Sequence, residues 1–383
     1  MSREIGEFMN IIYLDNSATT RIKTEVLNEM IPYLTTEYGN ASSLYSIGRK
    51  AKKAIEEARK KVAELINCNP HEIYFTGSGS ESDNTALKGF AYANKEKGNH
   101  IITSKIEHPA ILETCKTLER QGFEVSYINV DDGGNIKLDE LKNAIKPSTL
   151  LISIMTANNE IGTIEPIEEI ASIAHENNIV FHTDAVQAIG NMHIDVTKMG
   201  IDMLSLSGHK IGAPKGTGAL YIKKEIKVEK FINGGHQERN QRAGTENVAG
   251  IVGLGKACEI ANKNIDTHIK NLTRIRDYYL SRLQKEMPEK IRINGTMKNR
   301  LPGNANVSFE GANASELIFK LDEKGVCVSS GSACSSGDTS PSHVLTAIGV
   351  PEKYLNSAIR TTFGDNNTFE QVDYLIKAIK NIM

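Results

Sequence analysis

Short apolar runs alternate with amphipathic stretches along the first two thirds of the chain. We interpret five of these runs as buried strands, at residues 73–75, 101–103, 150–155, 179–181 and 203–206. Between them, apolar side chains recur at helical spacing with charged side chains on the opposite face, as in residues 47–66. This alternation predicts an α/β fold in which a mostly parallel sheet is covered by helices on both faces.

The last third of the chain has a different pattern. A long helical stretch at about residues 248–283 is followed by shorter α and β segments, and a final helix begins with a capping box at residues 368–371. We therefore predict a large domain at residues 16–262 and a smaller α+β C-terminal domain at residues 263–383. We expect residues 1–15 to form an N-terminal segment that packs with the small domain.

The composition is that of an ordinary globular protein. The chain has 383 residues, of which 39% are hydrophobic and 24% charged, and its net charge is −2. A chain so close to neutrality has no general attraction to nucleic acid or anionic membranes. Its first residues lack the apolar core of a signal peptide, and the apolar run at residues 150–155 is far too short to span a bilayer. We expect a cytoplasmic protein.

The cysteines show no metal-binding or disulfide pattern. There are five, and no two stand in a C-x-x-C pair. We interpret four of them as small buried apolar residues, namely Cys68, Cys115, Cys258 and Cys327. Cys334 differs because it lies in a Ser- and Gly-rich stretch at residues 328–341, where no large apolar residue flanks it. This stretch predicts a mobile loop.

Five polar motifs each follow one of the predicted strands. They lie at residues 76–81, 107–109, 158–162, 182–187 and 207–210. Taken alone, each has an ordinary explanation as a turn, a helix cap or a solvated surface residue. Ligands of open parallel sheets bind at the carboxyl ends of the strands, where all five motifs would meet. Five such motifs together therefore favour a ligand site.

The residue types in these motifs suit an aldehyde cofactor. Lys210 can form a Schiff base with the aldehyde, and Asp184 can hold a pyridine nitrogen protonated so that the ring withdraws electrons. His108 can stack on the ring and transfer protons. Small residues at 76–81 let the start of a helix approach a phosphate, and an amide at residues 158–159 can bond a phenolic oxygen.

Longer segments carry a specific likeness to one family. They are SGHK (207–210), NNEIG (158–162), TDAVQ (183–187), QERNQRAGTEN (237–247) and SSGSACSSG (329–337). On these segments the chain resembles cysteine desulfurases of the NifS/IscS type, within the fold-type I (aminotransferase class V) pyridoxal-phosphate enzymes. The resemblance runs from residues 13–20 to residues 359–364.

The resemblance implies a role for particular residues at the cofactor. Lys210 would bind the aldehyde and carry the Cα proton, Asp184 would pair with the pyridine nitrogen, and His108 would stack on the ring. Contacts to the phenolic oxygen are implied for Asn159 and Gln187. The cradle for the phosphate would consist of Gly79, Ser80, Ser207 and His209.

The resemblance also implies a substrate, a reaction and partners. Arg360, with Asn159, would bind the carboxylate of L-cysteine, because a guanidinium pairs with it in a bidentate way. Cys334 would attack the substrate sulfur as a thiolate, which leaves L-alanine and a persulfide on Cys334. Thr245 would reach the phosphate bound in a second subunit, so a homodimer is implied. The sulfur would pass to an iron–sulfur scaffold or another acceptor protein.

Metal ions have no intrinsic site under this interpretation, although Cys334 could meet cluster iron transiently on a scaffold. Two alternatives keep the cofactor and change the reaction: a selenocysteine lyase, or a transaminase, which has no use for Cys334. A third is a non-enzymatic sulfur-handling protein, which predicts a broken cofactor site. Lys210, Asp184, His108 and Arg360 are all present, so the sequence favours the desulfurase.

Some positions differ from the family's usual pattern. Tyr45 and Thr156 stand where histidine is frequent, Ser80 replaces a common threonine, and Asn240 replaces a usual glycine. None of these differences removes a group that the chemistry needs.

Overall fold

The computed structural model describes residues 11–330 and 341–383. Its main feature is a seven-stranded sheet, in the order β2-β8-β7-β6-β5-β3-β4. The strands are β2 (Ile73–Thr76), β8 (Gly218–Ile222), β7 (Met203–Ser207), β6 (Val180–Asp184), β5 (Thr149–Ser153), β3 (His100–Ser104) and β4 (Glu124–Ile128). Only β8 runs antiparallel to its neighbours. The predicted mostly parallel sheet is therefore confirmed.

The five strands expected from the sequence are all present, with shifted ends. β5 ends at Ser153 rather than Met155, and β6 continues to Asp184, three residues beyond its apolar run. The apolar pattern misses the end of β6 because His182, Thr183 and Asp184 are polar although all three are buried. This buried polar strand end is part of the candidate site.

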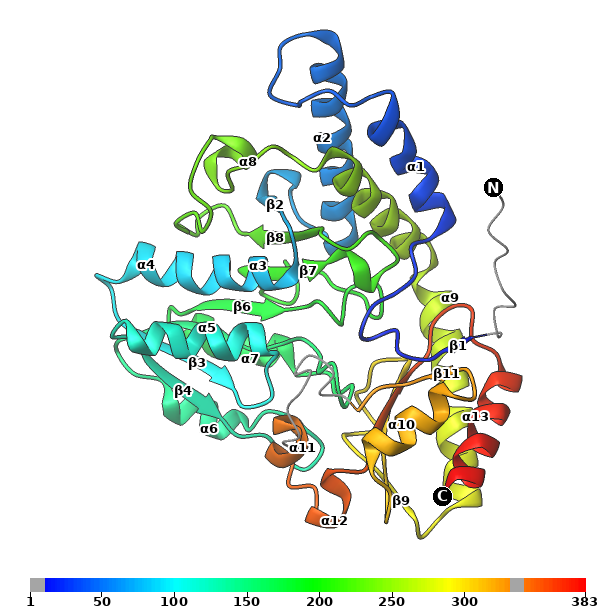
Figure 1. Ribbon diagram of the computed structural model, residues 1–383. Coiled ribbons are helices and arrows are strands. Elements are labelled where there is room, and N and C mark those ends of the chain that lie inside the picture. Colours follow the sequence, from blue (N-terminus) through cyan, green and yellow to red (C-terminus); the bar gives the residue numbers. More distant parts are fainter. Residues whose placement is uncertain (1–10, 331–340) are drawn as a thin grey trace.

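Helices cover both faces of the sheet, as Figure 1 shows. Neighbouring residues of a strand point to opposite faces, so Ile101 and Ile102 belong to different core clusters. One face packs against α1 (Thr24–Thr35), α2 (Ser46–Ile66), α6 (Leu138–Ala144), α7 (Ile167–Glu176) and the first part of α9 (Val248–Glu286). The other face packs against the π-helical turn η2 (Thr85–Gly89), α4 (Phe90–Asn94) and α5 (Pro109–Arg120). The turn η2 and α4 directly continue the helix α3 (Gly79–Asn84).

A smaller part follows the long helix α9. It contains the antiparallel sheet β12-β10-β9 and the parallel pair β1-β11. Its strands are β9 (Ile291–Ile293), β10 (Asn304–Phe309), β11 (Val326–Cys327), β12 (Ala358–Thr362) and β1 (Ile12–Tyr13). Its helices are α10 (Ala314–Asp322), α11 (His343–Ala347), α12 (Glu352–Leu355) and α13 (Phe369–Ile382). Thr368 caps α13 in the expected capping box.

Helix α9 is continuous across residue 262, where the sequence suggests a domain boundary. Leu254 and Ala257 pack in a core cluster of the main sheet, whereas Leu272 and Leu283 pack in that of the smaller part. The division into residues 16–262 and 263–383 stays a prediction.

Two remaining expectations concern cysteines and membranes. Cys115 and Cys258 are buried, but the expectation is wrong for Cys68 and Cys327, which are only partly buried. Within residues 11–330 and 341–383, none of the helices combines the length and apolarity that crossing a bilayer requires.

A buried ion pair fixes an unusual turn beside the sheet. The short helix α8 (Gln237–Asn240) holds Glu238, Arg239 and Asn240 at φ of 47°, 54° and 68°. Left-handed backbone costs L-residues about 1–2 kcal/mol each, with Asn among the more tolerant. Glu238 offsets this strain because its carboxylate accepts from both Nη atoms of Arg59, at 2.7 and 2.8 Å, and from the backbone N–H of Phe75 at 2.8 Å.

We expect Glu238→Gln to destabilise the protein. The amide keeps the shape of the side chain but removes the buried carboxylate, so Arg59 keeps only its pairing with the more exposed Glu56 at 3.2 Å. Removing one partner of a buried ion pair typically costs about 3–5 kcal/mol. Urea unfolding followed by circular dichroism measures the loss. Glu113→Gln is the control, because Glu113 pairs with Lys116 on the surface and its side chain is 65% exposed. Equal losses in the two variants would contradict this account.

Candidate active site

The five polar motifs meet at one edge of the main sheet. β2 and β7 both run antiparallel to β8, so they are parallel to each other and to β6, β5 and β3. The motifs of β2, β6 and β7 include the carboxyl end of their strand, and those of β3 and β5 follow it. The expectation that the strand directions would gather the motifs is therefore met.

Lys210 extends from the short 3-10 helix η3 (Gly208–Lys210) that follows β7. Its Nζ donates to the backbone oxygen of Ala18 at 2.9 Å and to that of Ser17. Gln187 Nε2 donates to the same Ser17 oxygen at 3.1 Å. Lys210 follows β7 and Gln187 follows β6, so one stretch of N-terminal backbone binds side chains from two different strand ends.

Asp184, His108 and Lys210 lie close enough that their charges affect the pKa values of Asp184 and His108. Burial raises the pKa of Asp184, while His108, a hydrogen bond from the Val186 N–H at 2.9 Å and Lys210 all act to lower it. Burial lowers the pKa of His108, and its Nδ1 accepts from the N–H of Ala110 at 3.1 Å. His108 is therefore a neutral imidazole whose Nδ1 carries no proton.

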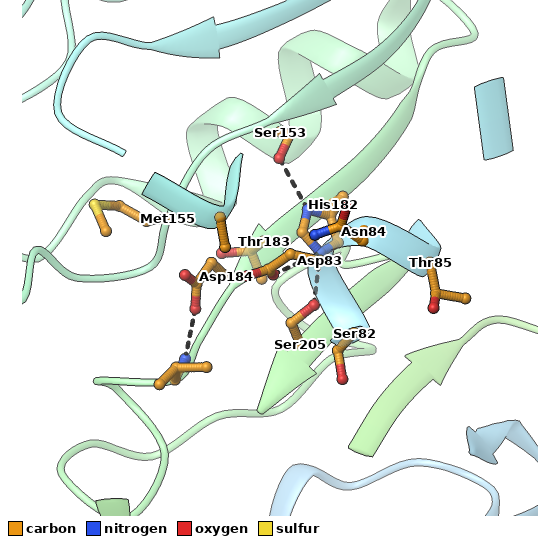
Figure 2. A network of polar contacts seen from close by, with 12 residues as sticks. Ser82, Asp83, Asn84, Thr85, Ser153, Met155, His182, Thr183, Asp184 and Ser205 are labelled. Carbon is orange, nitrogen blue, oxygen red and sulfur yellow. Dashed lines mark hydrogen bonds and ion pairs between the residues drawn. The ribbon is translucent and has the colours of Figure 1, made fainter. Parts of the chain in front are cut away.

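A cluster of polar side chains lies beside Asp184, as Figure 2 shows. His182 Nδ1 is 2.9 Å from Ser153 Oγ, and its Nε2 is 3.0 Å from Ser205 Oγ. Burial lowers the pKa of His182 to about 3. Asp83 of α3 is 1% exposed, and its Oδ1 lies 3.9 Å from His182 Nε2. Burial and then the charge of Asp184 raise the pKa of Asp83, so Asp184 is the better candidate for an anion there.

Gly79, the first residue of the predicted phosphate cradle, is closely packed. A Cβ on Gly79 would lie 2.7 Å from Val186 Cγ2, so a larger residue would force a shift. Ser80 follows on the exposed side of α3, and Ser207 is buried at the end of β7. His209 Nδ1 is 3.1 Å from Thr19 Oγ1, and burial, together with nearby lysines, lowers the pKa of His209 to about 4. Its ring is neutral, so a hydrogen bond rather than charge is what it can offer a phosphate.

Arg360 reaches the site from β12 in the smaller part. Its side chain is 3% exposed; Nη2 donates to Asp15 Oδ1 at 2.7 Å and Nη1 to the backbone oxygen of Asn159 at 3.2 Å. Among the described residues, its buried Nε has no hydrogen-bond partner. A buried N–H of a cation without an acceptor is costly, and an anionic ligand would satisfy it.

Two predicted site residues are not placed with the others. Thr245 is exposed in the loop before α9, and its proposed role toward a second subunit is not tested. Cys334 lies outside the described residues. Its flanks are anchored near the site, because Ser329 and Arg360 pair through their backbones, and Ser342 Oγ donates to Glu160 Oε2 at 2.6 Å.

Sequence reasoning missed Asp83 and assigned no role in the site to residues 15–20, although the family resemblance begins there. Nothing in the sequence around Asp83 marks it, because the pairing of α3 with the sheet is not visible in a local pattern. The segment has a usable signal: the apolar run at residues 11–14 is followed by Asp-Asn-Ser-Ala-Thr-Thr. An apolar run followed by polar residues is also the order found in the five recognised motifs.

No group of three or more His, Cys, Asp or Glu side chains suited to a metal ion occurs within the ranges that the structure describes. The donors that do gather are an amine, a carboxyl group, neutral imidazoles and a guanidinium. They suit a carbonyl cofactor and an anionic ligand.

Comparison with known proteins gives consistent matches. A family model described as aminotransferase class-V matches residues 12–375. A cysteine desulfurase IscS of Methanosarcina thermophila is 53% identical over 372 residues, which covers 97% of this chain and 92% of that protein. A cysteine desulfurase IscS of Clostridium botulinum is 50% identical over 374 residues, covering 97% and 94%.

Solved structures agree with these matches. A NifS-like protein superposes with a TM-score of 0.91 at 39% identity and covers 97% of this chain and 99% of its own. A structure described as SspA in complex with cysteine has a TM-score of 0.82 at 38% identity and covers 93% and 100%. The chain therefore belongs to the class-V aminotransferase family and, within it, to the cysteine desulfurases of the NifS/IscS type.

Proposed function

We propose that this protein uses pyridoxal phosphate to remove sulfur from L-cysteine, forming L-alanine and a persulfide on Cys334. One observation carries the proposal: Lys210, Asp184 and a neutral His108 share one electrostatic neighbourhood at the strand ends. Arg360 adds a buried Nε beside the motif at residues 158–162, and this Nε has no acceptor within residues 11–330 and 341–383. The cysteine complex of SspA supports cysteine as the substrate.

The residues present fit pyridoxal phosphate. Lys210 supplies the amine that binds its aldehyde, Asp184 the anion for its pyridine nitrogen, and His108 a flat neutral ring. Gly79, Ser80, Ser207 and His209 would hold the phosphate, and the space at Gly79 admits no side chain without a shift. When bound, the cofactor supplies an electron sink that makes the substrate Cα–H acidic.

The protein's own groups then divide the remaining work. Arg360 binds the substrate carboxylate and fixes the orientation of Cα. Lys210 takes the proton from Cα, and the carbonyl oxygens of Ser17 and Ala18 stabilise the resulting ammonium because they already accept from its Nζ. A proton can bind the neutral ring of His108 only at Nδ1, where it would replace the hydrogen bond from the Ala110 N–H.

Sulfur transfer balances without an added oxidant. The thiolate of Cys334 forms a bond with the substrate sulfur, the Cβ–S bond breaks, and Cβ keeps the electron pair of that bond and receives one proton to become the methyl group of alanine. L-cysteine and one protein thiol thus give L-alanine and one protein persulfide. A free thiol has a pKa of about 8.5, so a neighbouring base must help to form the thiolate at neutral pH.

Three further features are part of the proposal. Exposed Thr245 would contact the phosphate of a second subunit, which makes the protein a homodimer. An iron–sulfur scaffold or another acceptor protein would take the persulfide sulfur, and the reaction would occur in the cytoplasm. A selenocysteine lyase is the alternative reaction, because the same residues would accept selenocysteine; comparing product formation from the two amino acids distinguishes them.

Lys210→Ala should abolish covalent attachment of the cofactor. Without the amine, borohydride reduction of the loaded protein leaves no cofactor-derived mass on the peptide at residue 210, and alanine formation falls at least about 100-fold. Peptide mass spectrometry and an alanine assay measure the two effects. Lys215→Ala is the matched control because Lys215 is exposed five residues away. Retained attachment at another lysine would remove Lys210 from its role.

Cys334→Ser should bind L-cysteine and release no sulfur. Binding requires Lys210 and Arg360, which the substitution leaves intact, so the absorbance change of the cofactor on adding cysteine persists. Intact-mass analysis should find no added sulfur atom, and sulfide assays should find none released. Cys327→Ser serves as control because Cys327 is a partly buried residue of β11, which ends before the Ser- and Gly-rich stretch begins. Sulfide release at the normal rate from the Cys334 variant would refute the persulfide step.

A further inference from the structure

The segment at residues 15–20 connects residues from distant parts of the chain. Asp15 pairs with Arg360, the carbonyl oxygens of Ser17 and Ala18 accept from Lys210, and Thr20 Oγ1 donates to the His209 oxygen at 2.8 Å. It therefore contacts both the proposed carboxylate-binding residue and the proposed cofactor-binding lysine.

The backbone of Asp15 is fixed close to Arg360. Asp15 forms an isolated parallel bridge with Thr362, and the Thr362 N–H donates to the Leu14 oxygen at 2.7 Å. The Ser17 N–H donates to Thr362 Oγ1 at 2.8 Å. Because Thr362 lies two residues from Arg360 on β12, this pairing places the Asp15 carboxylate beside the guanidinium.

Two of the three guanidinium nitrogens are anchored. Nη2 donates to Asp15 at 2.7 Å and Nη1 to the Asn159 oxygen at 3.2 Å. A guanidinium is planar and carries five N–H groups in fixed directions, so anchoring two of its nitrogens fixes the third. The third, Nε, is buried and has no acceptor among the residues described.

We propose that Asp15 is a positioning residue for the substrate carboxylate, which holds the Arg360 guanidinium so that its Nε–H is left to donate to that carboxylate. The inference rests on the proposed role of Arg360. Asp15 does not touch the substrate; it acts through the orientation of Arg360. Its like charge also opposes the substrate carboxylate, so its benefit is geometric.

If Asp15 acts by orienting Arg360, two substitutions of Asp15 should differ in their affinity for L-cysteine. Asp15→Ala removes the acceptor and frees the guanidinium to turn, so L-cysteine should bind about tenfold more weakly or worse, as expected for a lost charged hydrogen bond. Asp15→Asn keeps an oxygen acceptor for Nη2 and removes the like charge, so it should bind L-cysteine at least several-fold better than Asp15→Ala.

The test measures dissociation constants from the absorbance of bound cofactor, with L-cysteine and with L-cysteine methyl ester as probes. The ester lacks the carboxylate, so Asp15→Ala should weaken its binding far less than that of cysteine; a general structural defect would weaken both equally. Asp373→Ala is the matched control. Asp373 lies on α13, and its partly exposed carboxylate pairs with Arg282 of α9 at 2.6 Å and not with Arg360.

Unchanged cysteine affinity in Asp15→Ala, or equal losses for cysteine and ester, would overturn the inference. Asp15→Asn binding as weakly as Asp15→Ala would also overturn it. These outcomes differ from failure of the proposed function, in which the unaltered protein forms no alanine from cysteine.

Discussion

Parallel pairing of the strands is the constraint on which the site depends. β2, β3, β5, β6 and β7 all run in one direction, so the residues that follow them meet at one edge although they are spread from residue 76 to residue 210. Helices cover both faces of the sheet, and the burial of individual side chains at this edge shifts their pKa values. Burial lowers the pKa of His182 to about 3, and burial and the charge of Asp184 raise the pKa of Asp83. Burial also raises the pKa of Asp184, but His108 and Lys210 act to lower it, which makes Asp184 the better candidate for the anion.

The N-terminal segment joins this edge to the smaller part. β1 pairs with β11, the next residues pair with the end of β12, and residues 17–20 then contact Lys210 and His209. Arg360 and Lys210 belong to different core regions, so neither sheet alone sets their relative position. A short stretch of backbone hydrogen-bonded to both provides that link.

The sequence predicted five of the seven strands of the main sheet, the long helix, the capping box of α13 and the motifs at the strand ends, because these follow from local periodicity and turn chemistry. It did not predict that β6 would bury three polar residues, nor the contacts of Asp15 with Arg360 and Asp83 with His182. Those depend on pairings between residues far apart in the chain, such as Asp15 with Thr362, which local patterns do not specify. Cys334 was recognised from its surroundings alone and lies outside the described residues.

The central claim is that sulfur moves from free cysteine to one thiol of this protein. Incubation of the loaded protein with cysteine carrying isotopically labelled sulfur, followed by peptide mass spectrometry, tests it most directly. The account predicts one labelled sulfur atom on Cys334 and an equal amount of alanine in a single turnover. Label on another cysteine, or alanine formed with no label on the protein, would contradict it.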